Sequence, residues 1–586
     1  MLASMASQQH KETPKESVKE TIISVVIAFA LAFVFRAFVA EAYVIPTGSM
    51  APTLNGAHVR VHSPATGLDW AVGPIPGAYI NNDAQNPVPE QGTFLRRQTE
   101  RSKAPAEGLI VHDAVTGQRL VDPVGQIRAG DRIFVHKYLY ALSEPQPWDV
   151  IVFKNPTDPD QNFIKRLIGL PNEEIAIVDG DIFFRPTSAS TTSPASGLAR
   201  WAEQGWHIRR KPARVQRSIW QRVYDSSYAP LPGHQVAGFT SPWVVAQGDI
   251  KVQEGGRWFI LAGTTPATLE WDHDATFIPP VKGGLFDTGA SRIDGTRELN
   301  DRYAYNESPD EYAARLRFPV GDLRVRFGLD LAGDSATLRL APTITTRGHE
   351  MRALIENQAV RLQMRTVDPN APAGEWTDLL PTPTPLPALR NGQLAEVEFW
   401  HVDQTLALDI NGQRVAVAPY DWSPATRLAN ATRGDLIDKL AQNAPGNPLR
   451  IANLYRRSGA RIEIAGTPAT LRRVGIDRDL FYTPADYPPY PQGGRVAGKP
   501  ALATSPASPL ALGPDQFFTC GDNSPNSSDG RLWSTVDDWI ATEIDPKLGV
   551  VDRRLLLGKA FFVYWPAVGS VGKVPVPDAG RMRFIQ

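Results

Sequence analysis

The sequence is poor in the residues that would give it a covalently linked or metal-stabilised core. Cys520 is the only cysteine in 586 residues, which excludes an internal disulfide and any cysteine-rich metal site. The formal net charge of -1 gives no reason to expect nucleic acid as a partner. None of the ten histidines has a triad-like setting, and the Gly-x-Ser-x-Gly elbow of many hydrolases is absent. We therefore expect no metal, no cofactor and no histidine-based catalytic triad.

Turn-forming residues are plentiful. The chain contains 51 prolines, 47 glycines and 14 tryptophans, which together indicate many turns and short strands. The chain is too long to fold around one compact core, so we expect two or three domains. Short apolar runs separated by turn residues predict an antiparallel sheet, and they lie at 130–138, 148–153, 163–170, 174–178 and 181–184. The Pro/Gly-rich stretch 55–128 shows little periodicity and is interpreted as an irregular excursion.

One segment is apolar enough to cross a membrane. Between Thr21 and Ala40 the only charged residue is Arg36, and about 20 apolar residues suffice to span a bilayer. Lysines in residues 1–20 favour a cytoplasmic N-terminus, with everything after Ala40 outside. We expect a single-pass protein of the inner (cytoplasmic) membrane, with the lipid bilayer as a partner. A cleavable signal peptide is the competing interpretation.

A second β-rich region follows between about 235 and 475. Apolar residues alternate from Leu323 to Leu331, as in a half-buried strand. Asn411-Gly412 separates two apolar runs, and this pair favours the positive φ angles of a type I′ hairpin turn. Pro212 to Tyr224 predicts a short amphipathic helix, and the Pro/Gly/Ser-rich stretch from Asp486 to Pro509 suits a linker. These patterns predict an inserted β-sandwich, which loosely resembles concanavalin-like jelly rolls.

Three short motifs lie outside this region. They are Ile45-Pro46-Thr47-Gly48-Ser49-Met50, Phe163-Ile164-Lys165-Arg166, and the polar loop from Gly521 to Arg531. A serine needs a base to become a nucleophile, and a lysine can serve if burial lowers its pKa from about 10.4 towards neutrality. Lys165 lies between Ile164 and the apolar run Leu167 to Leu170, which could bury it. Arg166 should point to the opposite face of the strand, so only one of the two cations need be buried.

Taken together, the three motifs resemble those of the bacterial type I signal peptidases, which are Ser-Lys proteases. The resemblance implies that Ser49 is the nucleophile and Lys165 the general base. It implies an oxyanion hole formed by the Thr47 hydroxyl and the Ser49 backbone N–H. It gives supporting roles to polar residues of the loop: Ser527 on the lysine, the ion pair Asp529 and Arg531, and the structural carboxylate Asp522.

The same resemblance implies a substrate and its binding residues. The substrate would be the signal peptide of an exported preprotein, cut after small residues of the Ala-x-Ala type. Its shallow apolar pockets would be walled by Tyr43, Ile45, Pro46, Met50, Leu54 and Ile164. An extended peptide can pair with a strand edge and direct alternate side chains into such pockets.

The predicted organisation is mainly β, with a signal-peptidase-like antiparallel core split by the insertion. It comprises a cytoplasmic N-terminus (1–20), a transmembrane helix (21–40), two catalytic parts (41–185 and 510–586) and the β-rich insertion with its linkers (186–509). Because all three motifs lie outside 186–509, we expect the insertion to be dispensable for cleavage, although it could bind an unknown partner. Two alternatives remain: a self-cleaving Ser-Lys protein of the repressor type, and a membrane-anchored protein whose sandwich binds glycan or protein on an inactive peptidase core.

Overall fold

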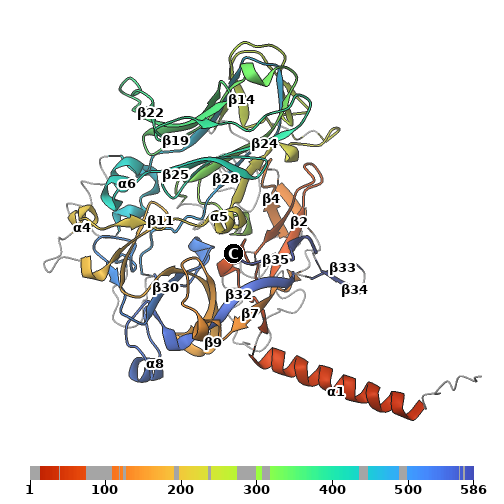
Figure 1. Ribbon diagram of the computed structural model, residues 1–586. Coiled ribbons are helices and arrows are strands. Elements are labelled where there is room, and N and C mark those ends of the chain that lie inside the picture. The colour runs from red at the N-terminus through yellow and green to blue at the C-terminus, as the bar shows by residue number, and fades with distance from the viewer. Residues whose placement is uncertain are drawn as a thin grey trace, which may run out of the picture.

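The computed structural model consists of two β-rich parts and a projecting N-terminal helix (Figure 1). It describes residues 14–38, 40–73, 109–117, 119–122, 127–189, 197–234, 236, 239–272, 298–306, 317–433, 447–487, 498–566, 568–571, 574–577 and 579–586. The first part, in the lower half of Figure 1, draws on both ends of the chain. The second is built from the middle of the chain and forms the upper half.

The lower part is organised on an eight-stranded sheet, here called the core sheet. Its strands in spatial order are β1 (Ala40–Val44), β7 (Arg132–Lys137), β32 (Leu556–Trp565), β8 (Val150–Asn155), β9 (Asp158–Gly169), β30 (Gln516–Cys520) and β31 (Val551–Asp552), with β35 (Arg583–Phe584) on β32. Their pairings are antiparallel. Since β32 separates β7 from β8 and β30 pairs with β9, residues before 186 and after 509 form one fold. This confirms the expectation of a mainly β, antiparallel structure.

Smaller elements surround the core sheet. A four-stranded sheet contains β12 (His207–Ile208), β11 (Asp181–Pro186), β10 (Glu173–Val178) and β29 (Leu510–Ala511). Two-stranded sheets pair β4 (Leu109–His112) with β5 (Arg119–Asp122), and β33 (Val568–Val571) with β34 (Val574–Pro577). The short helices are α3 (Leu139–Leu142), α4 (Ala199–Ala202) and α8 (Asp538–Glu543).

The described residues of the stretch 55–128 are more regular than their sequence indicated. β2 (His58–His62) pairs with β3 (Asp69–Val72) on one side and with β6 (Ile127–Arg128) on the other. The alternating apolar residues Val59 and Val61 of β2 are buried. Such a strand is too short to show a clear period in the sequence, and its partner β6 lies more than 60 positions away, so local reasoning missed the sheet.

The upper part is a sandwich of two antiparallel sheets. One contains β15 (Ile250–Gln253), β16 (Trp258–Leu261), β28 (Ala469–Arg478), β18 (Leu323–Leu331), β24 (Ala395–Val402), β25 (Thr405–Ile410) and β26 (Gln413–Pro419), with β13 (Gln221–Asp225) on β28. The other contains β14 (Trp243–Gln247), β17 (Ala267–Trp271), β27 (Gly459–Ala465), β19 (Arg339–Thr346), β20 (His349–Glu356), β21 (Ala359–Thr366) and β22 (Thr377–Asp378), with β23 (Thr384–Pro385) on β21. Apolar side chains of both sheets, such as Leu329 of β18 and Leu340 of β19, meet in one buried core.

Several local expectations for this region hold. β18 begins at Leu323 and ends at Leu331, as the alternation predicted. Asn411 and Gly412 join β25 to β26 with φ angles of 51° and 75°, as a type I′ turn requires. The amphipathic pattern after Pro212 gives the helix α5 (Ala213–Ile219), but its last residues enter β13 instead.

The middle of the chain does more than form the sandwich. The helix α6 (Pro424–Ala431) and residues of 197–210 pack against β10 and β11 in one buried cluster, where Phe183 meets Trp201 and Leu428. The expected linker is also partly core, since Ala501, Ala503 and Thr504 are almost fully buried. The two parts therefore share buried cores as well as a chain connection.

The N-terminal helix α1 (Pro14–Phe38) projects away from both parts (Figure 1). Its apolar side chains between Val18 and Phe29 are exposed. Within the residues that the structure describes, no helix meets the criteria of length and apolarity for a membrane span. Residues 1–13 of the expected cytoplasmic segment lie outside the described residues.

Candidate active site

Ser49 lies in the loop that follows β1, here called the serine loop (residues 45–57), which contains the 3-10 helix η1 (Gly48–Met50), here called the serine turn. Buried Asp131 holds this loop at both ends. Its carbonyl accepts a hydrogen bond from Ile45 N at 2.9 Å, and its own N–H donates to Asn55 O at 2.9 Å. Its carboxylate accepts a further bond from Asn55 N at 2.8 Å. The backbone on either side of Ser49 is thus fixed to the start of β7.

Lys165 reaches this loop from the neighbouring strand β9. Its Nζ lies 2.9 Å from Ser49 Oγ and also donates to Ile164 O at 3.2 Å. The side chain is 4% exposed, and the ring of Phe163 lies 4.8 Å from Nζ. Burial lowers the pKa of Lys165 to about 8, although nearby Asp529 opposes this by favouring the charged form. A serine hydroxyl and a lysine that is readily neutral near pH 8 therefore face each other.

The polar loop after β30 closes over the same point. Asp529 and Arg531 form a buried ion pair at 2.8 Å, and Asp529 also accepts from Gly521 N at 3.0 Å. Asn523 connects this loop to the serine turn, because its N–H donates to Ser49 O at 3.0 Å and its side-chain amide donates to Gly48 O at 2.9 Å. The loop therefore positions the backbone of the serine turn as well as bracing itself.

Arg166 is buried, contrary to the expectation that only Lys165 need be. The guanidinium is 0% exposed and makes two bonds of 2.7 Å to the Asp522 carboxylate. It also donates to Trp148 O and to the backbone oxygen of Gln586. Strand alternation correctly separates neighbouring side chains, but here the chain covers the second face too, which the local sequence does not reveal.

Ser527 does not make the hydrogen bond to Lys165 that we expected. Its hydroxyl is buried and has no partner at hydrogen-bonding geometry among the described residues. The hydroxyl is nevertheless near enough to the Asp529 carboxylate to help lower the pKa of that group. Ser527 therefore packs beside the buried acid of the loop in this conformation.

The middle of the chain also contributes to this site. Tyr303 donates to Asp522 O at 2.6 Å, and Tyr305 donates to Ala57 O at 3.0 Å. Asn306, at the end of the 3-10 helix η4 (Ala304–Asn306), exchanges side-chain hydrogen bonds with Asn523 at 2.6 and 2.8 Å. The sequence contains no motif around these residues, so only the fold reveals them.

A glycine in the serine turn permits this contact. A Cβ added to Gly48 would lie 2.2 Å from the ring of Tyr305, closer than any side chain could tolerate. The Gly48 of the sequence motif is thus matched to a residue 257 positions further along the chain. The segment 298–306, here called the strap, therefore forms part of the wall around Ser49, and the insertion is not independent of the site.

Comparisons with known proteins agree with this geometry. Residues 18–69 and 124–193 match the family described as signal peptidase, peptidase S26, and they include Ser49 and Lys165. These two segments are therefore similar to the signal peptidase family. Signal peptidase I of Aquifex aeolicus is 59% identical over 39 residues, which are 7% of this chain and 15% of the relative. Signal peptidase I of Rickettsia canadensis is 31% identical over 181 residues, which are 27% of this chain and 64% of the relative.

The relatives cover little of this chain, and the chain spans from 15 to 64% of the length of these two. Among solved structures, a carbohydrate binding module of Bacillus subtilis, CBM66, covers 41% of this chain and 96% of its own, with 7% identity and a TM-score of 0.20. Sheep galectin-11 covers 27% of this chain and 92% of its own, with 9% identity and a TM-score of 0.16. At these scores the likeness carries no argument, so the concanavalin-like character of the sandwich stays a prediction.

The residues predicted to wall the substrate pockets divide into two groups. Ile45, Met50 and Leu54 are at most 2% exposed and belong to the core beneath the serine loop. Because they are buried, they do not form open pocket walls in this conformation. Their positions in the motif predicted that they lie near Ser49, but could not predict whether they are exposed. Tyr43 and Ile164 are partly buried at the edge of the same cluster, and Pro46 is exposed.

A cluster of carboxylates lies between the two parts of the molecule. Asp181, Asp322, Asp403 and Asp479 are buried with carboxylate oxygens within 4.8 Å of one another. Three buried cations pair with them: Lys211 contacts Asp479 at 2.8 Å, Arg347 contacts Asp322 at 2.7 Å, and Arg427 contacts Asp181. Because cations already interleave the acids, we interpret the cluster as an ion-pair network that fastens the β10–β11 hairpin to the sandwich.

Proposed function

We propose that the chain is a membrane-anchored serine endopeptidase that removes signal peptides from exported proteins after small residues. The observation that carries the proposal is the contact of 2.9 Å between Ser49 Oγ and buried Lys165 Nζ. The family match of the two segments supports a hydrolase of the signal peptidase I type. The rest of the activity is inferred from the chemistry of the site.

In the proposed reaction, neutral Lys165 accepts the Ser49 proton while Oγ attacks the scissile carbonyl. The buried position suits this role, since it lowers the pKa of Lys165 to about 8 and leaves a useful neutral fraction near neutral pH. The protonated lysine then gives its proton to the leaving amine. Water activated by the same lysine releases the acyl-enzyme.

The developing oxyanion would be stabilised by the backbone N–H of Ser49 and the hydroxyl of Thr47. Thr47 immediately precedes η1, is exposed and makes no capping bond to that turn, so its hydroxyl can turn towards a substrate. Fixed donors of this kind are typically worth about 3 kcal/mol of barrier lowering each. Asp131 and Asn523 would act as positioning residues, because they hold the backbone of the turn.

Membrane anchoring and location at the inner membrane, with the site on the extracytoplasmic side, are part of the proposal. They rest on the apolar sequence of residues 21–40 and on the apolar side chains exposed along the first half of α1. A membrane anchor would keep the site near the signal peptides of exported preproteins. Retention in a washed membrane fraction, and its loss on removal of residues 1–40, would test this separately from catalysis.

The central experiment is cleavage of a fluorogenic signal peptide with an Ala-x-Ala site by the purified full chain. Ser49→Ala, Lys165→Ala and Lys165→Arg should each lose activity by at least about 1,000-fold, since arginine stays protonated at working pH. Lys154→Arg on the adjacent strand β8 is the matched control and should retain activity. Substantial cleavage by Lys165→Arg would contradict the dyad.

A further inference from the structure

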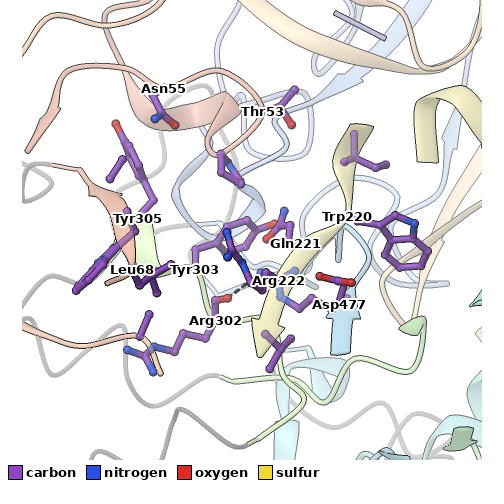
Figure 2. A pocket seen from close by; sticks show the side chains of 18 of the residues that line it. Thr53, Asn55, Leu68, Trp220, Gln221, Arg222, Arg302, Tyr303, Tyr305 and Asp477 are labelled. Atoms are coloured by element: carbon purple, nitrogen blue, oxygen red, sulfur yellow. Dashed lines mark hydrogen bonds between the residues drawn. The ribbon is translucent and has the colours of Figure 1, made fainter. Parts of the chain in front are cut away.

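A cavity lies between the serine loop, the strap and the sandwich (Figure 2). Its volume is about 780 Å³, within the size range of sites for small organic ligands. Thr53 and Asn55 contribute from the serine loop, Tyr303 from the strap, and Gln221 and Arg222 from β13. The cavity is thus formed where the peptidase segments meet the insertion, and neither part makes it alone.

The lining of the cavity is strongly basic. It contains only three acidic residues, Asp69, Glu298 and Asp477. It contains nine arginines, which are Arg60, Arg128, Arg222, Arg302, Arg324, Arg326, Arg478, Arg581 and Arg583. Burial lowers the pKa of the lining His58 to about 4, so this residue adds no positive charge at neutral pH. The lining is therefore strongly basic, although the net charge of the whole chain is -1.

Part of this charge is already compensated. Arg324 and Arg326 both bind Asp477, and Arg581 binds Asp131 at 2.9 Å. Arg60 lies 3.5 Å from Asp69. These pairs explain four of the nine arginines as structural.

Three of the other arginines, Arg222, Arg478 and Arg583, have no ion-pair partner among the described residues. Buried Arg478 donates to the carbonyl oxygens of Asp479 and Arg302, and its guanidinium lies 4.3 Å from the centre of the Tyr303 ring. Arg583 donates to Thr53 O at 2.7 Å, and burial lowers its pKa. Arg222 is exposed, with its guanidinium 4.7 Å from the ring of Tyr228. Guanidinium groups without acids favour an anion from outside the chain.

The remaining polar lining points to the same conclusion. Asn55 is 2% exposed and Gln221 is 8% exposed, yet Asn55 Oδ1 and Gln221 Nε2 lack partners at hydrogen-bonding geometry among the described residues. The indole N–H groups of Trp70 and Trp220 lack them too. Buried polar atoms are normally satisfied, so four unsatisfied atoms around one cavity indicate missing hydrogen-bond partners. Three of the four can donate, and together with the indole and phenol rings they suit an organic body bearing anionic oxygens.

We propose that this cavity binds an organic phosphate. A phosphate accepts several forked hydrogen bonds at once, as the cluster of guanidinium groups requires, whereas a lone carboxylate uses fewer. The rings of Trp70, Trp220, Tyr303 and Tyr305 provide apolar walls for the rest of the ligand. The phosphate group is common to soluble metabolites and to lipid headgroups, and the experiment below distinguishes these sources.

The site adjoins the proposed active site through the strap. Tyr303 and Tyr305 line the cavity and also contact Asp522 O and Ala57 O. A ligand seated against these rings would hold the strap on the serine loop. Binding itself does not depend on peptidase activity, so it can be tested whether or not the proposed function is correct.

The test is isothermal titration calorimetry on the full chain in a neutral detergent. The probes are inorganic phosphate, glycerol 3-phosphate and short-chain dihexanoyl phosphatidylglycerol, with dihexanoyl phosphatidylcholine as the zwitterionic lipid. Binding of glycerol 3-phosphate alone supports a soluble ligand, and preference for phosphatidylglycerol over phosphatidylcholine supports a lipid headgroup. The proposal is overturned if neither glycerol 3-phosphate nor phosphatidylglycerol binds, or if all four probes bind with equal affinity.

Variants locate the binding. Arg222→Glu should lower the affinity for the preferred probe at least tenfold, because it replaces a positive charge that attracts the phosphate with a negative one that repels it. Arg583→Gln, which removes a second charge from another element, should weaken it as well. Arg390→Glu is the matched control, since Arg390 is exposed and does not line the cavity. Unchanged affinity in both cavity variants, with folding confirmed by thermal melts, would show that the ligand binds elsewhere.

Discussion

The pH dependence of cleavage should follow the burial of Lys165. Burial lowers the pKa of this lysine from 10.5 to about 8, which corresponds to about 3 kcal/mol favouring the neutral form. With such a pKa, about one lysine in ten is neutral at pH 7 and about nine in ten at pH 9. A base must be neutral to act, so activity should rise about tenfold over this interval and level off above it.

Phe163→Ala provides the perturbation. Its ring lies 4.8 Å from Nζ, and its removal should admit water and return the pKa towards its ordinary value. The ring also stabilises the charged amine by a cation–π contact of about 1 kcal/mol, whose loss acts in the opposite direction. Because desolvation by burial is the first cause of the lowered pKa of Lys165, we expect the net change in this pKa to be upward.

The assay measures kcat/KM for cleavage of a fluorogenic signal peptide at pH values from 6 to 10. For each unit by which the pKa rises, the variant should lose about tenfold in activity at pH 7, while its activity at pH 10 approaches that of the unmodified protein. Phe584→Ala is the control, because Phe584 is exposed. A uniform loss at every pH, or a profile displaced to lower pH, would refute the reasoning.

Three further predictions concern the frame of the site. Tyr305→Phe keeps the ring against Gly48 but loses the bond to Ala57 O, so it should cost about 1 kcal/mol of stability in a thermal melt, and no change would mean that water replaces the bond. Replacing 186–509 by a short linker should abolish cleavage, because it deletes the strap and its bonds to the polar loop. The linker itself is feasible, since Pro186 and Ala511 lie opposite neighbouring residues of β10, and an active product would contradict this prediction. Arg427→Met should destabilise the fold by about 3 kcal/mol in urea unfolding, because it leaves buried carboxylates unpaired, and an unchanged midpoint would show that the ion-pair network does not hold the two parts together.

Sequence reasoning worked best where a few adjacent residues determine the outcome. The φ angles of a two-residue turn depend on Asn411 and Gly412 themselves, and the burial pattern of β18 repeats every second residue, so both could be predicted locally. The positions of Ser49 and Lys165 followed from motifs of a known family. The distance of 2.9 Å between Ser49 Oγ and Lys165 Nζ did not follow from any local pattern, since the two residues are 116 positions apart.

What the sequence could not supply is the identity of distant partners. The Tyr303 hydroxyl bonds a carbonyl 219 positions away, and Arg166 reaches a backbone oxygen 420 positions away. Backbone carbonyls carry no sequence signature, because every residue has one. A side chain that acts only on such groups is therefore invisible to motif analysis, whatever its importance to the site. The same limit explains why the sequence indicated an independent insertion. The bonds from the strap to Asp522 O and Ala57 O have no sequence signature, so only the folded chain reveals that the strap lies against the proposed active site.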